Sequence, residues 1–342
     1  MITRRQFVGG LAFSQGICLA AATPGASGAG EAPPRSFIGP LVIALIAPSQ
    51  APDEVRVKWQ PLADKLARRL GMSVELEVSR QYADVVKAVV SGRAHVAWLS
   101  NASALEVVES GSAEVFATMR VRGPEGQGVS GYRSQIVVRD DSPIRNVEDL
   151  LGNGKSLTLR MGDAKSTSGY IIPYYYLFAR RGLNPAEIFK SVLTGNHSNN
   201  MAAVIRGEAD AASTNDEEVK KLAQRDAGGA RRLRVVWSSQ EIRQSPLLWS
   251  TALPPSVHAG IKDVVFGFGQ TSAEQQMLME MNRVVKFVPS SNRQLQPIAD
   301  IDLFTARRNL AADTTFTSAQ KTAAEAKINS RATRLEMLLK RY

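Results

Sequence analysis

The hydroxyl side chains of Ser166, Thr167 and Ser168 are consecutive in the sequence and could together bind an anion. The stretch before them, SLTLRM, alternates as a strand does, and the stretch after them is long enough for a helix that ends at Gly182. A single hydroxyl at this position caps a helix by accepting a hydrogen bond from a free backbone N–H. Three hydroxyls beside the positive end of a helix can also surround an oxyanion. The local pattern is compatible with both roles.

The three histidines, His95, His197 and His258, are too far apart in the sequence to predict a metal cluster. His95 falls in a predicted buried strand and His258 on a predicted surface helix, so we expect structural roles for both. His197 stands in the polar loop TGNHSNN before a predicted helix, where a simple loop residue or a ligand-binding residue would fit. The sequence has no nucleophile elbow, Walker loop or helical pair of metal ligands. We therefore expect no catalytic residue, no metal and no cofactor.

The first 30 residues have the pattern of an export signal. Arg4 and Arg5 are followed by an apolar stretch too short to span a bilayer, and then by small residues suited to cleavage between Ala22 and Ala29. The stretch TRRQF is a twin-arginine pattern, so we expect export to the periplasm by a twin-arginine-type signal. The only cysteine, Cys18, lies within this segment, which leaves a mature chain without thiol chemistry.

The chain is basic, with 342 residues and a formal net charge of +10. Residues 1–30 contain two arginines and no acidic residue, so the mature protein would carry a charge of 10 − 2 = +8. A basic exported protein could bind nucleic acid, an anionic surface or a small anion. The sequence contains no basic patch interleaved with aromatic residues and no zinc-finger spacing. We therefore expect no nucleic-acid partner.

Predicted strands and helices alternate along the mature chain. Residues 40–47 form the first strand, and an amphipathic helix follows, its main part opened by Pro61 and closed by Gly71. The stretches MSVELEVS, AHVAWLS and AEVFATM are predicted strands, separated by the predicted helices YADVVKAVVSG and NASALEVVESG. This alternation predicts an α/β fold with mostly parallel sheets flanked by helices.

Two short stretches repeat one pattern, 203 − 88 = 115 residues apart. AVVSGRAHVA begins at Ala88 and AVIRGEADAA at Ala203, and both predict a helix end, a capping glycine and an Ala-rich strand. Each is followed by a polar strand end and a new helix. We therefore predict two similar lobes, with ligand-binding residues at the carboxyl ends of their strands. The predicted first lobe comprises residues 38–131 and 250–342, the second comprises 132–249, and the crossings lie near 131–139 and 235–252.

The last predicted helix, in SAQKTAAEAKINSRATRLEMLLKRY, has Ile328, Leu335 and Leu338 along one side. This side can pack on the helix's own lobe or form a contact with a second copy of the chain. We expect either a monomer or a dimer through this helix.

Four stretches together resemble the PhnD family, the periplasmic phosphonate-binding proteins of ABC importers: QYADVVKAVVSGRAHVAWLSN, YRSQIVVRDDSPI, GDAKSTSGYIIPYYYLFA and GNHSNNMAAVIRGEADAASTNDEEVKKL. The resemblance extends over about residues 41–310. It implies a two-lobed periplasmic binding protein fold of type II, with a ligand cleft between the lobes. It also implies that the hydroxyls at 166–168 bind the phosphonate oxygens, together with Tyr82 and His197.

The resemblance also shows where this chain differs from members that bind 2-aminoethylphosphonate. In those members two carboxylates hold the ammonium group; Glu217 matches one of them, and Ser245 stands in place of the other. Leu99, in AWLSN, stands where a tyrosine is expected, and we expect Leu99 and Asn101 to line the pocket. A small alkylphosphonate or a bare oxyanion should therefore fit better than the aminoethyl ligand.

The expected function is to capture a phosphonate or related phosphorus oxyanion in the periplasm and to deliver it to a permease of the inner membrane. A secreted hydrolase that uses Ser166 or Ser168 with His197 is one alternative, and it requires a base held against the serine in the free protein. A ligand-sensing protein of the same fold, acting on a membrane receptor, is another.

Overall fold

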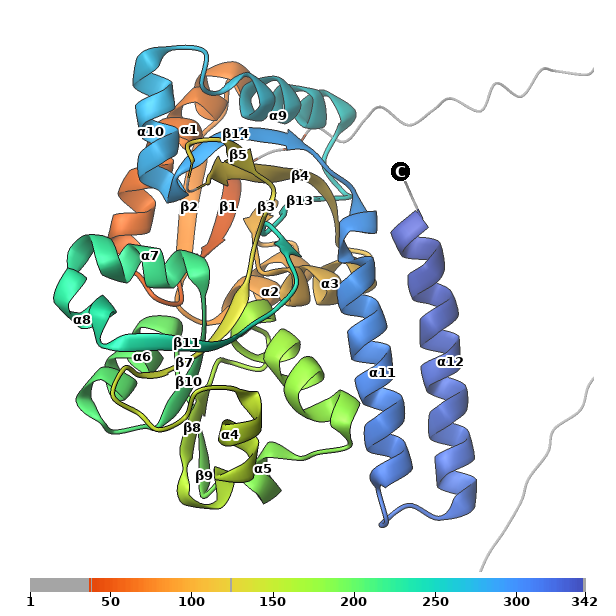
Figure 1. Cartoon of the computed structure of the whole chain (residues 1–342). Coiled ribbons are helices and arrows are strands. Elements are labelled where there is room, and N and C mark those ends of the chain that lie inside the picture. Colours follow the sequence, from red (N-terminus) through yellow and green to blue (C-terminus); the bar gives the residue numbers. More distant parts are fainter. Residues whose placement is uncertain (1–36, 38, 124, 341–342) are drawn as a thin grey trace, which may run out of the picture. The chain divides into compact units, whose positions relative to one another are not determined.

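Strands and helices alternate over most of the chain, and the strands form two large sheets (Figure 1). The computed structural model describes residues 37, 39–123 and 125–340, so the predicted export signal lies outside the described residues. No helix in this part of the chain is both long and apolar enough to cross a membrane. The predicted α/β architecture is confirmed.

The first sheet contains seven strands in the order β14-β4-β13-β3-β1-β2, with β5 paired to β4. Its parallel part, β2-β1-β3, is extended by antiparallel strands. Because successive side chains of a strand point to opposite faces, β1 supplies Leu41 and Ile43 to one hydrophobic core and Ala44 and Ile46 to another. The strands are β1 (Leu41–Ile46), β2 (Val74–Ser79), β3 (Val96–Trp98), β4 (Ala113–Arg122), β5 (Gly128–Val129), β13 (Leu247–Ser250) and β14 (Val284–Pro289).

Helices cover both faces of the first sheet. One face packs against α1 (Pro52–Leu70), α9 (Pro255–Gly267) and α10 (Ser272–Asn282). The other packs against α2 (Tyr82–Val90), α3 (Asn101–Glu109), the short 3-10 helix η5 (Asn292–Leu295), α11 (Gln296–Ala312) and α12 (Ser318–Lys340).

The first helix differs from its prediction at one end. It begins at Pro52, which fits the first helical turn because a proline there loses no intrahelical hydrogen bond, and Pro61 lies inside the helix. The prediction that Pro61 opens its main part is therefore wrong. Gly71 closes the helix as predicted, with a φ of 66°.

The second sheet contains five strands in the order β11-β7-β10-β8-β9. β8 pairs in parallel with β9 and β10, whereas β7 pairs antiparallel with β10 and β11. Both sheets are therefore mixed, and the prediction that they are mostly parallel is wrong. Its strands are β7 (Ser134–Arg139), β8 (Thr158–Met161), β9 (Ser191–Thr194), β10 (Ala211–Asn215) and β11 (Leu233–Ser238). Its helices are α4 (Val147–Gly152), η1 (Gly154–Ser156), η2 (Thr167–Ile171), η3 (Tyr174–Phe178), η4 (Ala179–Arg181), α5 (Pro185–Ile188), α6 (His197–Arg206), α7 (Asp216–Arg225) and α8 (Ala227–Arg231).

Two crossings connect the sheets, and they pair with each other. β6 (Gly131–Tyr132) leads from the first sheet to the second, and β12 (Ile242–Arg243) leads back. The two form a small antiparallel pair in which Ile242 lies opposite Tyr132. Both lie within the predicted crossings. The returning strand β13 already belongs to the first sheet, although the predicted boundary at 249/250 leaves most of it in the second lobe.

Both copies of the repeated pattern fold as predicted. Gly92 after α2 and Gly207 after α6 have φ values of 76° and 77°, a left-handed conformation that glycine adopts without steric cost. The strands β3 and β10 follow, and α3 and α7 begin soon after them. The carboxyl ends of β3 and β10 therefore occupy equivalent positions in the two sheets.

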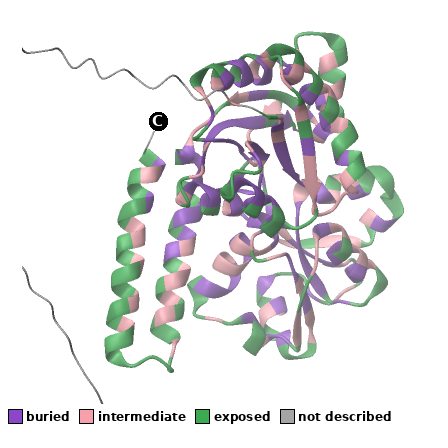
Figure 2. Cartoon of the chain, turned by 180° about the vertical axis from the view of Figure 1, so that it is seen from behind, coloured by how far each residue is buried: buried purple, intermediate pink, exposed green. Residues whose placement is uncertain are grey.

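The last helix packs on its own chain. α12 lies alongside α11 (Figure 1), its outer surface is mostly exposed (Figure 2), and Leu335 and Leu339 are buried against the first sheet's helices. Arg331 forms ion pairs with Glu109 of α3 and Asp302 of α11. The first of the two roles predicted for this helix is confirmed, and a dimer contact stays a prediction.

Candidate functional site

A cavity of about 90 Å³ lies at the carboxyl ends of β1, β3 and β10 and is lined by residues of both sheets. Seven of the nine residues expected to bind the ligand line it: Tyr82, Ser166, Thr167, Ser168, His197, Glu217 and Ser245. The cavity therefore brings together these seven expected residues, which are up to 245 − 82 = 163 positions apart in the sequence.

Leu99 and Asn101 do not line this cavity. Trp98 does, and because side chains alternate along a strand, Leu99 points to the opposite face, where it is fully buried in the core. The amide of Asn101 donates to the carbonyl of Arg243 at 2.9 Å and accepts from the side chain of Gln294 at 2.8 Å. The expectation that Leu99 and Asn101 line the pocket is therefore wrong.

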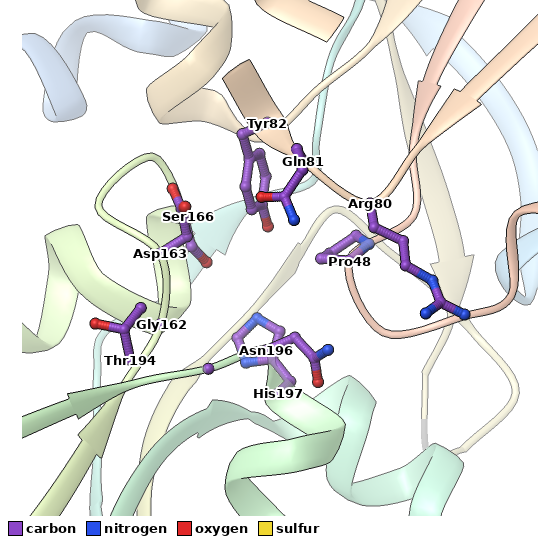
Figure 3. A pocket seen from close by; sticks show the side chains of 11 residues that line it. Pro48, Arg80, Gln81, Tyr82, Gly162, Asp163, Ser166, Thr194, Asn196 and His197 are labelled. Atoms are coloured by element: carbon purple, nitrogen blue, oxygen red, sulfur yellow. The ribbon is translucent and has the colours of Figure 1, made fainter. Parts of the chain in front are cut away.

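A second, wider cavity of about 360 Å³ shares Tyr82, Ser166 and His197 with the first. Figure 3 shows the ring of Tyr82 and the imidazole of His197 on opposite sides of this space. Tyr82 is the first residue of α2, beside the first sheet, and His197 is the first residue of α6, beside the second. Both sheets thus contribute residues to this cavity as well.

The segment that carries the hydroxyls is a distorted helix held to the second sheet. Pro173 has no N–H to donate to the carbonyl of Gly169, four residues earlier. That carbonyl instead accepts from the backbone N–H of Gly162 at 2.8 Å and from the hydroxyl of Ser213 in β10 at 2.5 Å. These bonds fix the start of the helical segment against the ends of β8 and β10.

Ser166 caps this helical segment, because its hydroxyl accepts from the backbone N–H of Gly169 at 3.1 Å. The capping role considered for the hydroxyls therefore holds for one of the three. A Cβ at Gly169 would lie 2.8 Å from the Ser166 hydroxyl and 3.2 Å from Cε1 of His197. A glycine at this position lets the imidazole approach the start of the helix.

Thr167 and Ser168 have partners in different parts of the chain. The hydroxyl of Thr167 accepts from the backbone N–H of Ala102, in α3, at 2.9 Å. The hydroxyl of Ser168 accepts from the side-chain amide of Asn215, at the end of β10, at 3.1 Å. A hydroxyl that accepts one hydrogen bond keeps its own proton to donate. Both hydroxyls can therefore donate to an oxyanion in the cavity.

Two buried phenols, Tyr82 and Tyr132, add further donors. Burial raises the pKa of Tyr82 to about 12, against a smaller effect of its hydrogen bond with Ser166. Burial also raises the pKa of Tyr132, and the negative charge of Glu217 acts in the same direction. Both phenols therefore keep their protons at neutral pH. Tyr132 was not predicted as a site residue, and its only sequence signal is its place in a crossing.

His197 is buried, and burial lowers the pKa of its imidazole below the usual 6.5. Asn215 fixes the tautomer: its Oδ1 accepts from the backbone N–H of Glu218 at 2.9 Å, so its Nδ2 faces Nε2 of His197 at 3.4 Å. Nε2 must then accept, and Nδ1 carries the proton. Nδ1 is buried and has no partner among the described residues, which makes it a free donor.

Two carboxylates and one lysine of α7 also line the cavity. Glu218 pairs with Lys221 at 2.8 Å, and although burial opposes it, the lysine keeps the pKa of Glu218 low. Glu217 accepts from the side-chain amide of Gln244 at 2.7 Å, and burial raises its pKa. The inner cavity is therefore rich in neutral donors, and the lysine in its wall is paired with Glu218.

The hydrolase alternative requires a base held against Ser166 or Ser168. In the described part of the chain, Nε2 of His197 faces the amide of Asn215, and no hydrogen bond joins His197 to either serine. The arrangement does not support the hydrolase.

Comparison with known proteins agrees with this geometry. The family model described as "ABC transporter, phosphonate, periplasmic substrate-binding protein" matches residues 44–295. The phosphonates-binding periplasmic protein of Escherichia coli K12 is 31% identical over 259 residues, 76% of this chain and 75% of the relative. The phosphate-import protein PhnD of Mycolicibacterium smegmatis is 27% identical over 228 residues, 64% of this chain and 69% of the relative.

Two solved structures are similar in fold. A binding protein component of an ABC phosphonate transporter from Pseudomonas aeruginosa has a TM-score of 0.77 and 29% identity, covering 87% of this chain and 96% of that one. PhnD1 of Prochlorococcus marinus, in complex with methylphosphonate, has a TM-score of 0.66 and 19% identity, covering 76% and 96%. The two-lobed fold is that of periplasmic binding proteins of type II. With most of its length matched, the chain belongs to the family of periplasmic substrate-binding proteins of ABC phosphonate transporters.

Proposed function

We propose that this protein binds a phosphonate or a related phosphorus oxyanion in the periplasm and delivers it to a permease of the inner membrane, without catalysing a reaction. The observation that carries the proposal is the convergence of neutral donors on one cavity. Five residues that carry such donors line it: Ser166, Thr167, Ser168, Tyr82 and His197. Such donors can surround a dianion without a full countercharge.

The expected strength of this site is sufficient for capture. Each hydrogen bond to a charged group contributes about 1.5–3 kcal/mol net. Four or five such bonds cover the roughly 8 kcal/mol of a micromolar complex before the cost of ordering is subtracted. The ligand would thus be held by several donors together, and the loss of one or two should be measurable.

The tail of the ligand is expected to be small or absent. The inner cavity has a volume of only about 90 Å³. A buried ammonium group needs acceptors, and here Ser245 offers a neutral hydroxyl while Glu217 already accepts from Gln244. Two similar proteins support a ligand with a small tail or none, since one is described as a phosphate-import protein and the other was solved in complex with methylphosphonate.

The two lobes are expected to close around the ligand. We propose lobes of residues 38–131 and 250–342 and of residues 132–249, joined at β6 and β12, with β13 assigned to the first lobe because it belongs to the first sheet. Export by a twin-arginine-type signal in residues 1–30 would bring the protein to the periplasm, where it acts as a monomer or as a dimer through α12.

A thermal-shift panel of phosphonates, phosphite, phosphate and sulfate tests the proposal. A ligand present at about 100 times its dissociation constant stabilises the folded state by about 2.7 kcal/mol, which corresponds to several degrees in Tm for a chain of this size. We expect such a shift with at least one phosphorus oxyanion. No shift with any of them, in a protein shown to be folded, would contradict the proposed function.

A further inference from the structure

Two polar atoms on the first-sheet side of the inner cavity have no hydrogen-bond partner among the described residues. They are the indole Nε1 of Trp98 and the hydroxyl oxygen of Ser49, and both atoms are buried. Trp98 ends β3, Ser49 follows the end of β1, and these strands are parallel neighbours with Leu45 opposite Trp98. The two atoms therefore belong to one edge of the first sheet.

The lack of a partner is informative for Trp98, because an indole N–H donates and cannot accept. Burying such a donor without an acceptor is unfavourable, so buried indoles are normally paired. Trp249, in the same sheet, shows this arrangement: its Nε1 donates to the carboxylate of Glu114 at 2.8 Å. Trp98 has no such acceptor among the described residues, and it lines the inner cavity.

The two carboxylates nearby do not accept a hydrogen bond from the indole of Trp98 in this structure. Glu217 and Glu218 lie in the wall of the same cavity, but no hydrogen bond joins either to Trp98 in the described part of the chain. Glu218 is paired with Lys221, and Glu217 accepts from Gln244. No described residue thus accepts from the indole in this structure, and a ligand in the cavity can supply the acceptor.

We propose that Trp98 and Ser49 form a donor pair that binds an oxygen atom of the ligand on the first-sheet side. This inference rests on the proposed function and narrows its ligand class. The hydroxyl cluster and His197 belong to the second sheet, so the bound ligand presents oxygen atoms toward both sheets. Orthophosphate can do so with its fourth oxygen and hydroxymethylphosphonate with its hydroxyl, whereas methylphosphonate has a methyl group in that place.

Calorimetry with three ligands of similar size tests this inference in the wild-type protein, at a pH where all three are dianions. We expect phosphate and hydroxymethylphosphonate to bind about tenfold more tightly than methylphosphonate, the effect of one hydrogen bond to a charged or polar ligand oxygen. Equal affinities would overturn the donor pair while leaving the proposed function in place. No binding of any of the three would contradict the proposed function itself.

The substitution Trp98→Phe removes the N–H and keeps an aromatic ring. It should weaken phosphate and hydroxymethylphosphonate about tenfold and methylphosphonate less than about twofold. Trp237→Phe is the matched control, because Trp237 is a partly buried indole that lines neither cavity. Equal weakening of all three ligands by Trp98→Phe would assign Trp98 a packing role and overturn the inference.

A second readout does not depend on the folding of that variant. The chain has four tryptophans, so indole ¹⁵N labelling gives four N–H signals, and replacing the other three one at a time identifies the Trp98 signal. We expect this signal to move on addition of phosphate much more than on addition of methylphosphonate. An unchanged Trp98 signal in phosphate-saturated protein would contradict a bond to the ligand.

Discussion

The hydroxyl of Thr167, in the second lobe, accepts a hydrogen bond of 2.9 Å from the backbone N–H of Ala102, in the first turn of α3 in the first lobe. The start of α3 also contacts the backbone just before Thr167: the hydroxyls of Ser100 and Ser103 donate to the carbonyl of Lys165 at 2.8 and 3.3 Å. A side chain that can donate to the ligand is thus also an acceptor for the opposite lobe. In the proposed function, Thr167 therefore takes part both in ligand binding and in lobe closure.

Replacing Thr167 by Val should weaken oxyanion binding about tenfold or more, because it removes both the donor to the ligand and the acceptor for Ala102. The variant Thr167→Ser keeps the hydroxyl and is the matched control, with an affinity within about threefold of the wild type. Calorimetric titration of both variants with phosphate measures the difference. Equal losses in the two variants would point to packing of the threonine methyl group.

Ligand binding should make the molecule more compact. The contacts between α3 and the backbone near Lys165 join the two sheets, and we expect the chain to bend at the paired strands β6 and β12 that connect them. Small-angle scattering should give a smaller radius of gyration with saturating ligand than without it. An unchanged profile, with binding verified in the same sample, would indicate a rigid site.

The buried imidazole of His197 should make stability depend on pH. Its pKa is lowered below 6.5 in the folded state, so its contribution to the free energy of unfolding is fully present above pH 6.5 and declines as the pH falls below that value. The raised pKa of Glu217 acts with the opposite sign, since its contribution declines as the pH rises above 4.5. The variant His197→Asn isolates the first effect.

Urea denaturation at about pH 7.5 and about pH 5.5 measures this difference. The wild type should lose more stability than His197→Asn between the two values. If the two proteins lose the same amount, His197 is not held neutral by its surroundings.

The aminoethyl ligand should have no advantage at this site. With Ser245 in the wall and Glu217 engaged by Gln244, 2-aminoethylphosphonate should bind no more tightly than methylphosphonate, and Ser245→Asp should restore part of a preference for it. Ser245→Asn is the uncharged control. A wild-type protein that binds the aminoethyl ligand about a hundredfold more tightly would show that Glu218 or Asp216 takes the ammonium, and the specificity argument would fail.

Much of the fold could be predicted because its signals are local. Gly92 and Gly207 end helices in equivalent places, and the repeated pattern around them predicted two similar halves that meet at strand ends. Composition alone does not locate the start of the first helix, because Pro52 and Pro61 are both acceptable at a helix start. Only the packing of the residues between them decides which one is used.

The sequence predicts a site residue when its type and local pattern are enough to indicate its role. It does not do so when the role depends on contacts with distant residues. The alternation of side chains along β3 predicts that Trp98 and the following residue, Leu99, face opposite ways. The roles of Tyr132 and Asn215 depend on contacts with residues more than 10 positions away, such as the bond from Asn215 to Ser168. Contacts of this kind come from the tertiary fold and leave no local pattern.

The central claim is that the hydroxyl cluster binds a phosphorus oxyanion, and one calorimetric comparison tests it most directly. Purified wild-type protein and the double variant Thr167→Ala, Ser168→Ala are each titrated with phosphate and methylphosphonate, with the melting temperature as a check of folding. The account predicts micromolar or tighter binding of at least one ligand by the wild type and at least about tenfold weaker binding by the double variant, a change of about 1.4 kcal/mol. An unchanged affinity in the folded double variant would return these hydroxyls to a purely structural role and contradict the account.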